Sequence, residues 1–459
     1  MSDTIDLKLT RRAVLAGSAG ALAALGLARS PLAGAAAFAP AAEPWLLPAH
    51  DLAASRAAGV AIGGVSERWR AHLAGGITGA PLISRDHVLA ASFGGDVGAF
   101  DLSTGEQRWL RSLGTATYAG NRQLGFFGGP AVCGDRIVVA SDHAQCLDVR
   151  TGATIWRADP LRPPGGDDYF WAQPAIVDGI VLLGSGSGSE EEPTRGRLTA
   201  YSLEGGSLLW STPMVPPGGN GGGILGQPTV DLRRRRVYVA TGAAYVPQPG
   251  TEPGTDSLVE LRLDDGEIVW ADQVHVGDQL GLDLNSSPVL AGDLVVVAGK
   301  DGFRAWNRAS GIRLWHVQVT PATPSPGQPA GPTSGPEGGP IAFDGRRIYG
   351  LSNDATAGTC VAVALEPRSG TVLWHNALPA FSFAAPAVSD DAVAVPGADG
   401  TLRLLAPEDG KLLSELPLLQ PSSGAPSLTR RRLLIGTGAG PFLPGDSLIC
   451  FTGPATERR

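Results

Sequence analysis

Residues 287–315, SPVLAGDLVVVAGKDGFRAWNRASGIRLW, have the pattern of four short antiparallel strands. The expected strands are 288–290, 294–298, 303–307 and 312–315, and each is separated from the next by a turn signal. Gly292-Asp293 and Asp301-Gly302 are typical of tight turns, because glycine accepts the positive φ that these turns need. The rest of the chain repeats this unit, and repeated units bury their core against their neighbours.

Two signatures mark the repeats. The first is a proline that opens a short apolar strand, where its missing N–H removes no needed ladder bond. It occurs at Pro81, Pro130, Pro174, Pro228, Pro288, Pro340, Pro386 and Pro426. The second is a turn glycine followed four positions later by a tryptophan that can bury a large area between adjacent sheets. It occurs at Gly105/Trp109, Gly152/Trp156, Gly206/Trp210, Gly266/Trp270, Gly311/Trp315 and Gly370/Trp374.

A seventh glycine, Gly410, has Ser414 in place of the tryptophan, and the last unit has no glycine signature. Trp69, conversely, precedes the first proline unit and lacks a unit of its own. We therefore predict an all-β fold, an eight-bladed β-propeller of four-stranded antiparallel blades. The N-terminal strand around Trp69 completes the last blade, whose other strands lie near 425–428, 433–436 and 447–451. The alternatives are an open solenoid or two separate sandwiches, but closure leaves no unpaired edge around the ring.

The spacing of the strands also predicts where the long connections lie. If the strands of each blade run a, b, c, d from the axis outward, the b–c and d–a connections share one rim of the ring. The long insertions all fall in these connections, at 111–127, 157–172, 186–197, 211–226, 243–257, 274–286, 320–339, 353–358 and 438–446. Loops held on a rigid scaffold usually carry function. The functional site is therefore expected on this rim, over the central channel.

Residues 1–35 have the pattern of a twin-arginine signal peptide. Arg11-Arg12 precedes the Ala/Gly/Leu run 13–28, and Ala33-Gly34-Ala35 offers a cleavage site. The run is too short to span a bilayer comfortably, although an uncleaved anchor is the alternative. Residues 36–59 form an N-terminal extension, 60–453 the propeller and 454–459 a tail. The expected location is extracellular, periplasmic or in the cell envelope, by the twin-arginine route.

Composition excludes several classes of function. The net charge of −8 disfavours nucleic-acid binding. The four cysteines, Cys133, Cys146, Cys360 and Cys450, form no CxxC or CxxCH pattern, which disfavours a covalent haem or a zinc knuckle. All four are expected to be buried thiols. The histidines show no metal-binding spacing, and we expect a monomer with no membrane span in the mature chain.

Residues 101–109, DLSTGEQRW, and 148–156, DVRTGATIW, resemble the tryptophan-docking repeat of the pyrroloquinoline quinone (PQQ) propellers. This quinoprotein family includes alcohol dehydrogenases, polyvinyl-alcohol-dehydrogenase-like proteins and the outer-membrane assembly propeller. The resemblance covers residues 60–453. It implies the eight-bladed fold and says little about chemistry.

Residues 226–315 are most similar to the dehydrogenase branch. There the resemblance places Ala243 where the enzymes have an Asn that ligates Ca²⁺, and Leu225 near the position of a Trp that stacks on the quinone. Lys300 matches a basic residue that contacts the quinone carbonyls, and Asp283 is the carboxylate nearest to the catalytic position. The resemblance therefore implies that the ligation of calcium and PQQ is largely lost.

Other interpretations of these residues stay open. Asp278, Asp283 and Asn285 could form a base or a cation site, or cap a strand as a polar loop. Lys300 could simply flank a hairpin. The aromatic residues of 167–171 and 126–127 could form a lip for a polymer or peptide, or pack within the loops.

The sequence thus favours an exported binding or scaffold module that docks a protein, peptide or glycan on the rim of long connections, with no cofactor. The alternative is a quinoprotein-type, PQQ-dependent alcohol dehydrogenase using calcium, with Lys300 contacting the cofactor and Asp283 as the catalytic residue.

Overall fold

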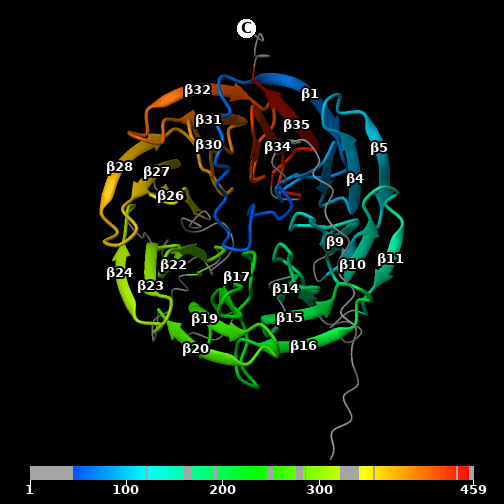
Figure 1. The fold of residues 1–459 in the computed structure, drawn as a ribbon, viewed down its shortest axis with the longest axis vertical. Coiled ribbons are helices and arrows are strands. Elements are labelled where there is room, and N and C mark those ends of the chain that lie inside the picture. The colour runs from blue at the N-terminus through cyan, green and yellow to red at the C-terminus, as the bar shows by residue number, and fades with distance from the viewer. Residues whose placement is uncertain are drawn as a thin grey trace, which may run out of the picture. The chain divides into compact units, whose positions relative to one another are not determined.

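Eight antiparallel sheets surround one axis, and no helix occurs among the residues that the structure describes (Figure 1). The structure is a computed structural model. It describes residues 45–118, 122–159, 167–189, 194–244, 253–274, 283–284, 286–320, 341–354, 357–440 and 443–453. The fold is the predicted all-β eight-bladed propeller, and residues 287–315 form one blade of it.

The blades follow one another in chain order. Blade 1 contains β2 (Leu82–Ser84), β3 (His87–Ala91), β4 (Asp96–Asp101) and β5 (Gln107–Ser112). Blade 2 contains β8 (Ala131–Cys133), β9 (Arg136–Ala140), β10 (Ala144–Asp148) and β11 (Thr154–Arg157). Blade 3 contains β13 (Ala175–Val177), β14 (Ile180–Ser187), β15 (Arg197–Ser202) and β16 (Leu208–Pro213). Blade 4 contains β17 (Thr229–Asp231), β18 (Arg236–Ala240), β19 (Ser257–Arg262) and β20 (Ile268–Gln273).

Blade 5 contains β21 (Val289–Ala291), β22 (Leu294–Gly299), β23 (Gly302–Asn307) and β24 (Arg313–Val317). Blade 6 contains β25 (Ala342–Phe343), β26 (Ile348–Asp354), β27 (Thr359–Leu365) and β28 (Val372–Leu378). Blade 7 contains β29 (Ala387–Val388), β30 (Val393–Pro396), β31 (Thr401–Leu405) and β32 (Leu412–Pro417). Blade 8 contains β33 (Ser427–Thr429), β34 (Arg432–Gly436), β35 (Ser447–Thr452) and β1 (Ser66–His72). Outside this pattern, β12 (Asp168–Tyr169) pairs with β14, and β6 (Ala116–Thr117) pairs with β7 (Gln123–Leu124).

The ring closes where the two ends of the propeller meet. β1 lies beside β35 (Figure 1), and the two strands pair antiparallel with Trp69 opposite Cys450. Blade 8 then joins blade 1 near the axis, because the Ser427 hydroxyl donates to the carbonyl of Pro81 at 2.5 Å. The prediction that an N-terminal strand completes the last blade is confirmed.

Each docking tryptophan reaches the turn between strands c and d of the following blade. The indole N–H groups donate to backbone carbonyls there, with distances of 3.1 Å for Trp69–Leu102, 2.9 Å for Trp109–Val149, 2.8 Å for Trp156–Leu203, 3.1 Å for Trp210–Leu263, 2.9 Å for Trp315–Pro367 and 2.9 Å for Trp374–Pro407. Trp270 is the exception, since its N–H has no acceptor. The corresponding carbonyl, that of Arg308, accepts from Tyr238 and Arg234 instead.

The repeated glycine serves this contact directly. Gly105 has a φ of +74°, and a Cβ on it would lie 2.6 Å from an atom of the Trp69 ring. The turn glycines of blades 2 to 7 meet the tryptophan of the preceding blade in the same way. This geometry also explains why blade 7 has Ser414 in place of a docking tryptophan. The next blade, blade 8, has no turn between strands c and d, because the fourth strand of blade 8 comes from the other end of the chain.

A pair of glycine substitutions separates the two requirements of these turns, which are a positive φ and space for the indole ring. Gly134 and Gly152 have φ of +63° and +66°, but only Gly152 faces an indole, with Trp109 at 2.6 Å from the added Cβ. We expect Gly134→Ala to lower the free energy of unfolding by about 1–2 kcal/mol, the left-handed penalty alone. Gly152→Ala should cost about 1–3 kcal/mol more, because the ring must shift. Equal losses in denaturant titrations would contradict tryptophan docking on the glycine.

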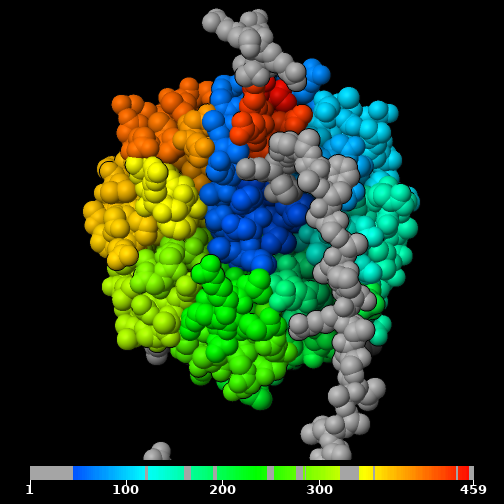
Figure 2. Space-filling view, viewed as in Figure 1, coloured from blue at the N-terminus to red at the C-terminus, as the bar shows by residue number. Residues whose placement is uncertain are grey.

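Residues 45–62, here called the hub strap, run across the inner strands at one face of the ring. Figure 2 shows the N-terminal residues, in blue, over the centre of this face. Backbone hydrogen bonds tie the strap to seven blades, through Trp45–Ile83, Leu46–Val132, Leu52–Val230, Ala53–Leu290, Ser55–Phe343, Arg56–Val388 and Ala61–Arg431. Nothing in the repeat pattern predicted this packing.

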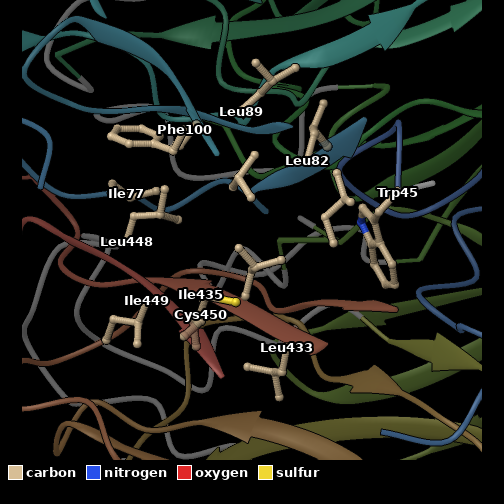
Figure 3. Close-up of a cluster of buried hydrophobic side chains, with 14 of the residues drawn as sticks. Trp45, Ile77, Leu82, Leu89, Phe100, Leu433, Ile435, Leu448, Ile449 and Cys450 are labelled. Atoms are coloured by element: carbon tan, nitrogen blue, oxygen red, sulfur yellow. The ribbon is translucent and has the colours of Figure 1, made fainter. Parts of the chain in front are cut away.

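The strap contributes to the largest hydrophobic core. Trp45 is fully buried and lies in one cluster with residues of blades 1 and 8, among them Leu82 and Leu433 (Figure 3). The backbone hydrogen bonds from the strap to Ile83 and Arg431 lie at or beside the turns between strands a and b. The strap therefore covers the rim of the a–b turns. In an antiparallel blade, the b–c and d–a connections leave at the other rim, here called the connection rim.

The cysteine prediction is partly wrong. All four cysteines are free, and Cys146, Cys360 and Cys450 are buried, but Cys133 is exposed. Cys133 is the last residue of β8, where the chain enters the turn to β9. Burial raises the pKa of the Cys360 and Cys450 thiols to about 12, as expected of inert core side chains.

The predicted signal peptide, 1–35, and tail, 454–459, lie outside the described residues. Within the part of the chain that the structure describes, no helix has the length and hydrophobicity to cross a membrane.

Candidate functional site

Blades 4 and 5 bring together the residues that the sequence singled out. Ala243 follows β18, Asp283 lies between β20 and β21, and Lys300 lies between β22 and β23. All three therefore belong to b–c or d–a connections, on the connection rim. The Lys300 ammonium forms an ion pair with the Asp283 carboxylate. The same carboxylate accepts a hydrogen bond from the backbone N–H of Ala243 at 2.5 Å.

A second carboxylate, missed by the sequence reasoning, holds Asp283 in place. The backbone N–H of Asp283 donates to Asp256 Oδ1 at 2.7 Å, and Asp256 is 1% exposed. Both residues have left-handed backbones, with φ of 39° for Asp283 and 45° for Asp256. Such strain is tolerated best by Asp and Asn and tends to occur at functional positions. No sequence signal distinguished Asp256 from the other loop aspartates.

The ion pair is largely shielded from solvent, since the side chains of Lys300 and Asp283 are 14% and 18% exposed. Its environment is made by the ends of the neighbouring strands. Leu284 N–H donates to the carbonyl of Thr241 at 3.2 Å, which fixes the loop against blade 4. Asp278 and Asn285, the other members of the predicted polar cluster, lie outside the described residues.

The described residues at the positions that the family resemblance assigns to calcium and PQQ do not fit these groups. Calcium takes six to eight oxygen ligands, but the side chain of Ala243 offers none. The Asp283 carboxylate is already engaged by Lys300 and by the Ala243 N–H. Among the described residues, no three His, Cys, Asp or Glu side chains gather as metal ligands would. Leu225, near the stacking position, has no aromatic face.

Leu225 instead packs against a buried aromatic cluster on the connection rim. Trp171 lies edge-on to Phe127 at 5.1 Å and to Tyr169 at 4.7 Å between ring centroids. Tyr169 is 1% exposed, and its hydroxyl donates to the carbonyl of Gly125 at 2.9 Å. Burial raises the pKa of Tyr169 well above its ordinary value. Trp171 is 5% exposed, and its N–H donates to the carbonyl of Ser187 at 2.7 Å. These rings pack within the loops and do not form an exposed lip.

Comparisons with known proteins identify the family. The family described as outer membrane protein assembly factor BamB matches residues 54–158, 140–325 and 302–440. A polyvinylalcohol dehydrogenase from Pseudomonas sp is 26% identical over 84% of this chain and 68% of that protein. The outer membrane protein assembly factor BamB of Yersinia pestis is 24% identical over 77% of this chain and 80% of that protein.

Solved structures show the same fold at lower identity. The quinohemoprotein alcohol dehydrogenase from Comamonas testosteroni superposes with a TM-score of 0.76 at 17% identity, covering 90% of this chain and 81% of the other. BamB from Moraxella catarrhalis gives a TM-score of 0.59 at 17% identity, covering 85% of this chain and all of the other. With the repeated glycine–tryptophan contacts and the eight blades, the family match shows that this chain belongs to the PQQ-like propeller family described as outer membrane protein assembly factor BamB.

Proposed function

We propose that this protein is an exported binding scaffold that docks a protein, peptide or glycan on its connection rim. The observation that carries the proposal is the composition of the candidate site. The family resemblance places Ala243 and Leu225 at the calcium and stacking positions, and the Asp283 carboxylate is held by Lys300 and the Ala243 N–H. Such a site keeps the family's framework without the side chains for its redox chemistry.

The architecture supports the choice of rim. The hub strap covers the rim of the a–b turns, which favours the connection rim as the face that binds a ligand. Leu419, in the connection between β32 and β33, is 79% exposed and has a φ of 67°. A leucine with a positive φ is uncommon, and the exposed side chain of Leu419 is available to contact a partner.

The proposed location is the cell envelope, reached by the twin-arginine route, with the protein acting as a monomer. Relatives named outer membrane protein assembly factor support the location. Docking of another macromolecule is compatible with the same relatives.

Photo-crosslinking tests the docking surface. We would introduce benzoylphenylalanine at Leu419, and at Leu232 as the control, an exposed leucine in the a–b turn of blade 4. In cells of the natural host, position 419 should give a discrete adduct that position 232 does not give. Protease or glycosidase treatment then identifies the partner class, and Leu419→Asp should weaken binding of the isolated partner at least tenfold. Identical adduct patterns at both positions, or none at either, would refute the proposal.

The second candidate is a quinoprotein-type, PQQ-dependent alcohol dehydrogenase. Two observations favour it: Lys300 and Asp283 meet on the rim, and a relative is named polyvinylalcohol dehydrogenase. Under this candidate, protein supplied with PQQ and Ca²⁺ oxidises alcohols with a dye acceptor. Lys300→Met should then abolish the rate, while Lys411→Met, which removes an exposed lysine in the turn between β31 and β32, should not change it.

A further inference from the structure

Arg56 is a charged side chain enclosed in the hub strap. It is 2% exposed and among the largest fully buried side chains of the described residues. Its backbone is fixed on both sides, since its N–H donates to the carbonyl of Ala49 at 3.1 Å and its carbonyl accepts from Val388 of β29 at 3.0 Å. The guanidinium therefore lies inside the ring, where the strap meets the inner strands.

Few groups compensate the charge of this guanidinium. One terminal nitrogen donates to the carbonyl of Pro48 at a long 3.4 Å, and Nε has no acceptor. Asp51 is near in sequence, but its carboxylate accepts hydrogen bonds from the N–H of Ser55 at 2.9 Å and its hydroxyl at 2.6 Å. No ion pair joins Arg56 to a carboxylate among the described residues.

The fold treats its other buried guanidiniums differently. The Arg304 side chain is 5% exposed and forms an ion pair with Asp301 through both terminal nitrogens. The Arg403 side chain is 6% exposed and pairs with Asp399 at 2.6 Å and Glu415 at 3.0 Å. Arg56 is thus as buried as these residues and lacks their carboxylates.

An isolated buried charge is expensive, and proteins normally pair it or neutralise it. Burial lowers the pKa of Arg56 to about 10, an effect that the charge of Asp51 partly offsets. The guanidinium consequently stays protonated at neutral pH. It has five N–H donors in a planar fork, of which the Pro48 carbonyl engages one.

We infer that Arg56 binds a small anion inside the hub, of the size of chloride or a one-carbon carboxylate. The anion would accept the Nε–H and the remaining terminal N–H groups, in the role that Asp301 plays for Arg304. Because Arg56 is only 2% exposed, we take the anion to be small. This inference is independent of the proposed docking function.

Thermal melting in different anions tests the site. At constant ionic strength, potassium gluconate is replaced stepwise by chloride, formate or sulfate. Sulfate stabilises folded proteins in general, so the site shows as a response to chloride and formate beyond this general salt effect. The wild-type melting temperature should rise by about 1–2 °C for each tenfold increase in chloride or formate above the dissociation constant. Arg56→Met should show only the general salt effect. Arg304→Met is the control: it should be less stable but keep the response to chloride and formate.

A direct measurement on the wild-type protein covers the case in which Arg56→Met does not fold. The ³⁵Cl NMR line of chloride should broaden when the wild-type protein is added. Formate should remove the excess width by competing for the site. A wild-type melting temperature that does not distinguish chloride from gluconate would overturn the inference. So would an Arg56→Met variant that keeps the anion response, or a chloride line that is not broadened.

Discussion

A chain that begins at Leu73 is expected to form no stable monomeric propeller. It would lack β1, which supplies the fourth strand of blade 8 and pairs with β35 from Ser66 to His72. It would also lack Trp69, which docks on Leu102 and Gly105 of blade 1. Loss of one buried tryptophan costs about 3–5 kcal/mol, and a domain is typically stable by only about 5–15 kcal/mol. Removing the whole strand should exceed this margin.

Size-exclusion chromatography and thermal melting measure the effect. The comparison is a chain that begins at Trp45 and keeps every described residue, which should elute as a folded monomer. The chain from Leu73 should aggregate or exchange strands between copies, because β35 becomes an unpaired edge. A monomer with an unchanged melting temperature would show that β1 is dispensable for closure.

A chain that begins at Val65 should fold but melt at a clearly lower temperature. It keeps β1 and loses the hub strap, with the buried side chains of Trp45 and Ile62. The inner strands of seven blades would lose their backbone partners in the strap. We expect a loss of at least about 3–5 kcal/mol in the free energy of unfolding, from the tryptophan alone.

The dye ANS reports the exposed hub in this second truncation. The chain from Val65 should bind ANS under native conditions, and the chain from Trp45 should not. Equal denaturation midpoints for the two chains would mean that the strap adds no stability. The difference between the chains from Val65 and Leu73 then isolates the contribution of β1.

The repeat architecture was predictable because its physical cause is local. The left-handed turn of each unit needs a glycine such as Gly152, and a tryptophan follows at a fixed spacing, so each unit has the same signature in the sequence. Counting the signatures also showed that the last blade lacks its fourth strand, which the segment around Trp69 supplies. The degenerate Ser414 was visible in the sequence, but its reason required the ring, because it lies where blade 8 has no turn to receive an indole.

The packing of the strap and the geometry of the candidate site were predictable only in part. The strap has no repeat, and its contacts with seven blades depend on the curvature of the assembled ring. The meeting of Asp283 and Lys300 was suggested by the family resemblance alone, and Asp256 had no signal at all. Whether Cys133 or Trp171 is exposed depends on which loop covers each one, and this is a tertiary property.

The proposed function requires that this propeller has lost the site for PQQ and calcium. Equilibrium dialysis of the purified protein against PQQ with Ca²⁺ tests it most directly, followed by dye-linked alcohol oxidation, with an authentic quinoprotein alcohol dehydrogenase as the positive control. We predict no retained quinone and no turnover, because Ala243 and Leu225 stand where the family resemblance places the ligand and the stacking ring. One quinone retained per chain, with alcohol oxidation that Lys300→Met abolishes, would contradict the account.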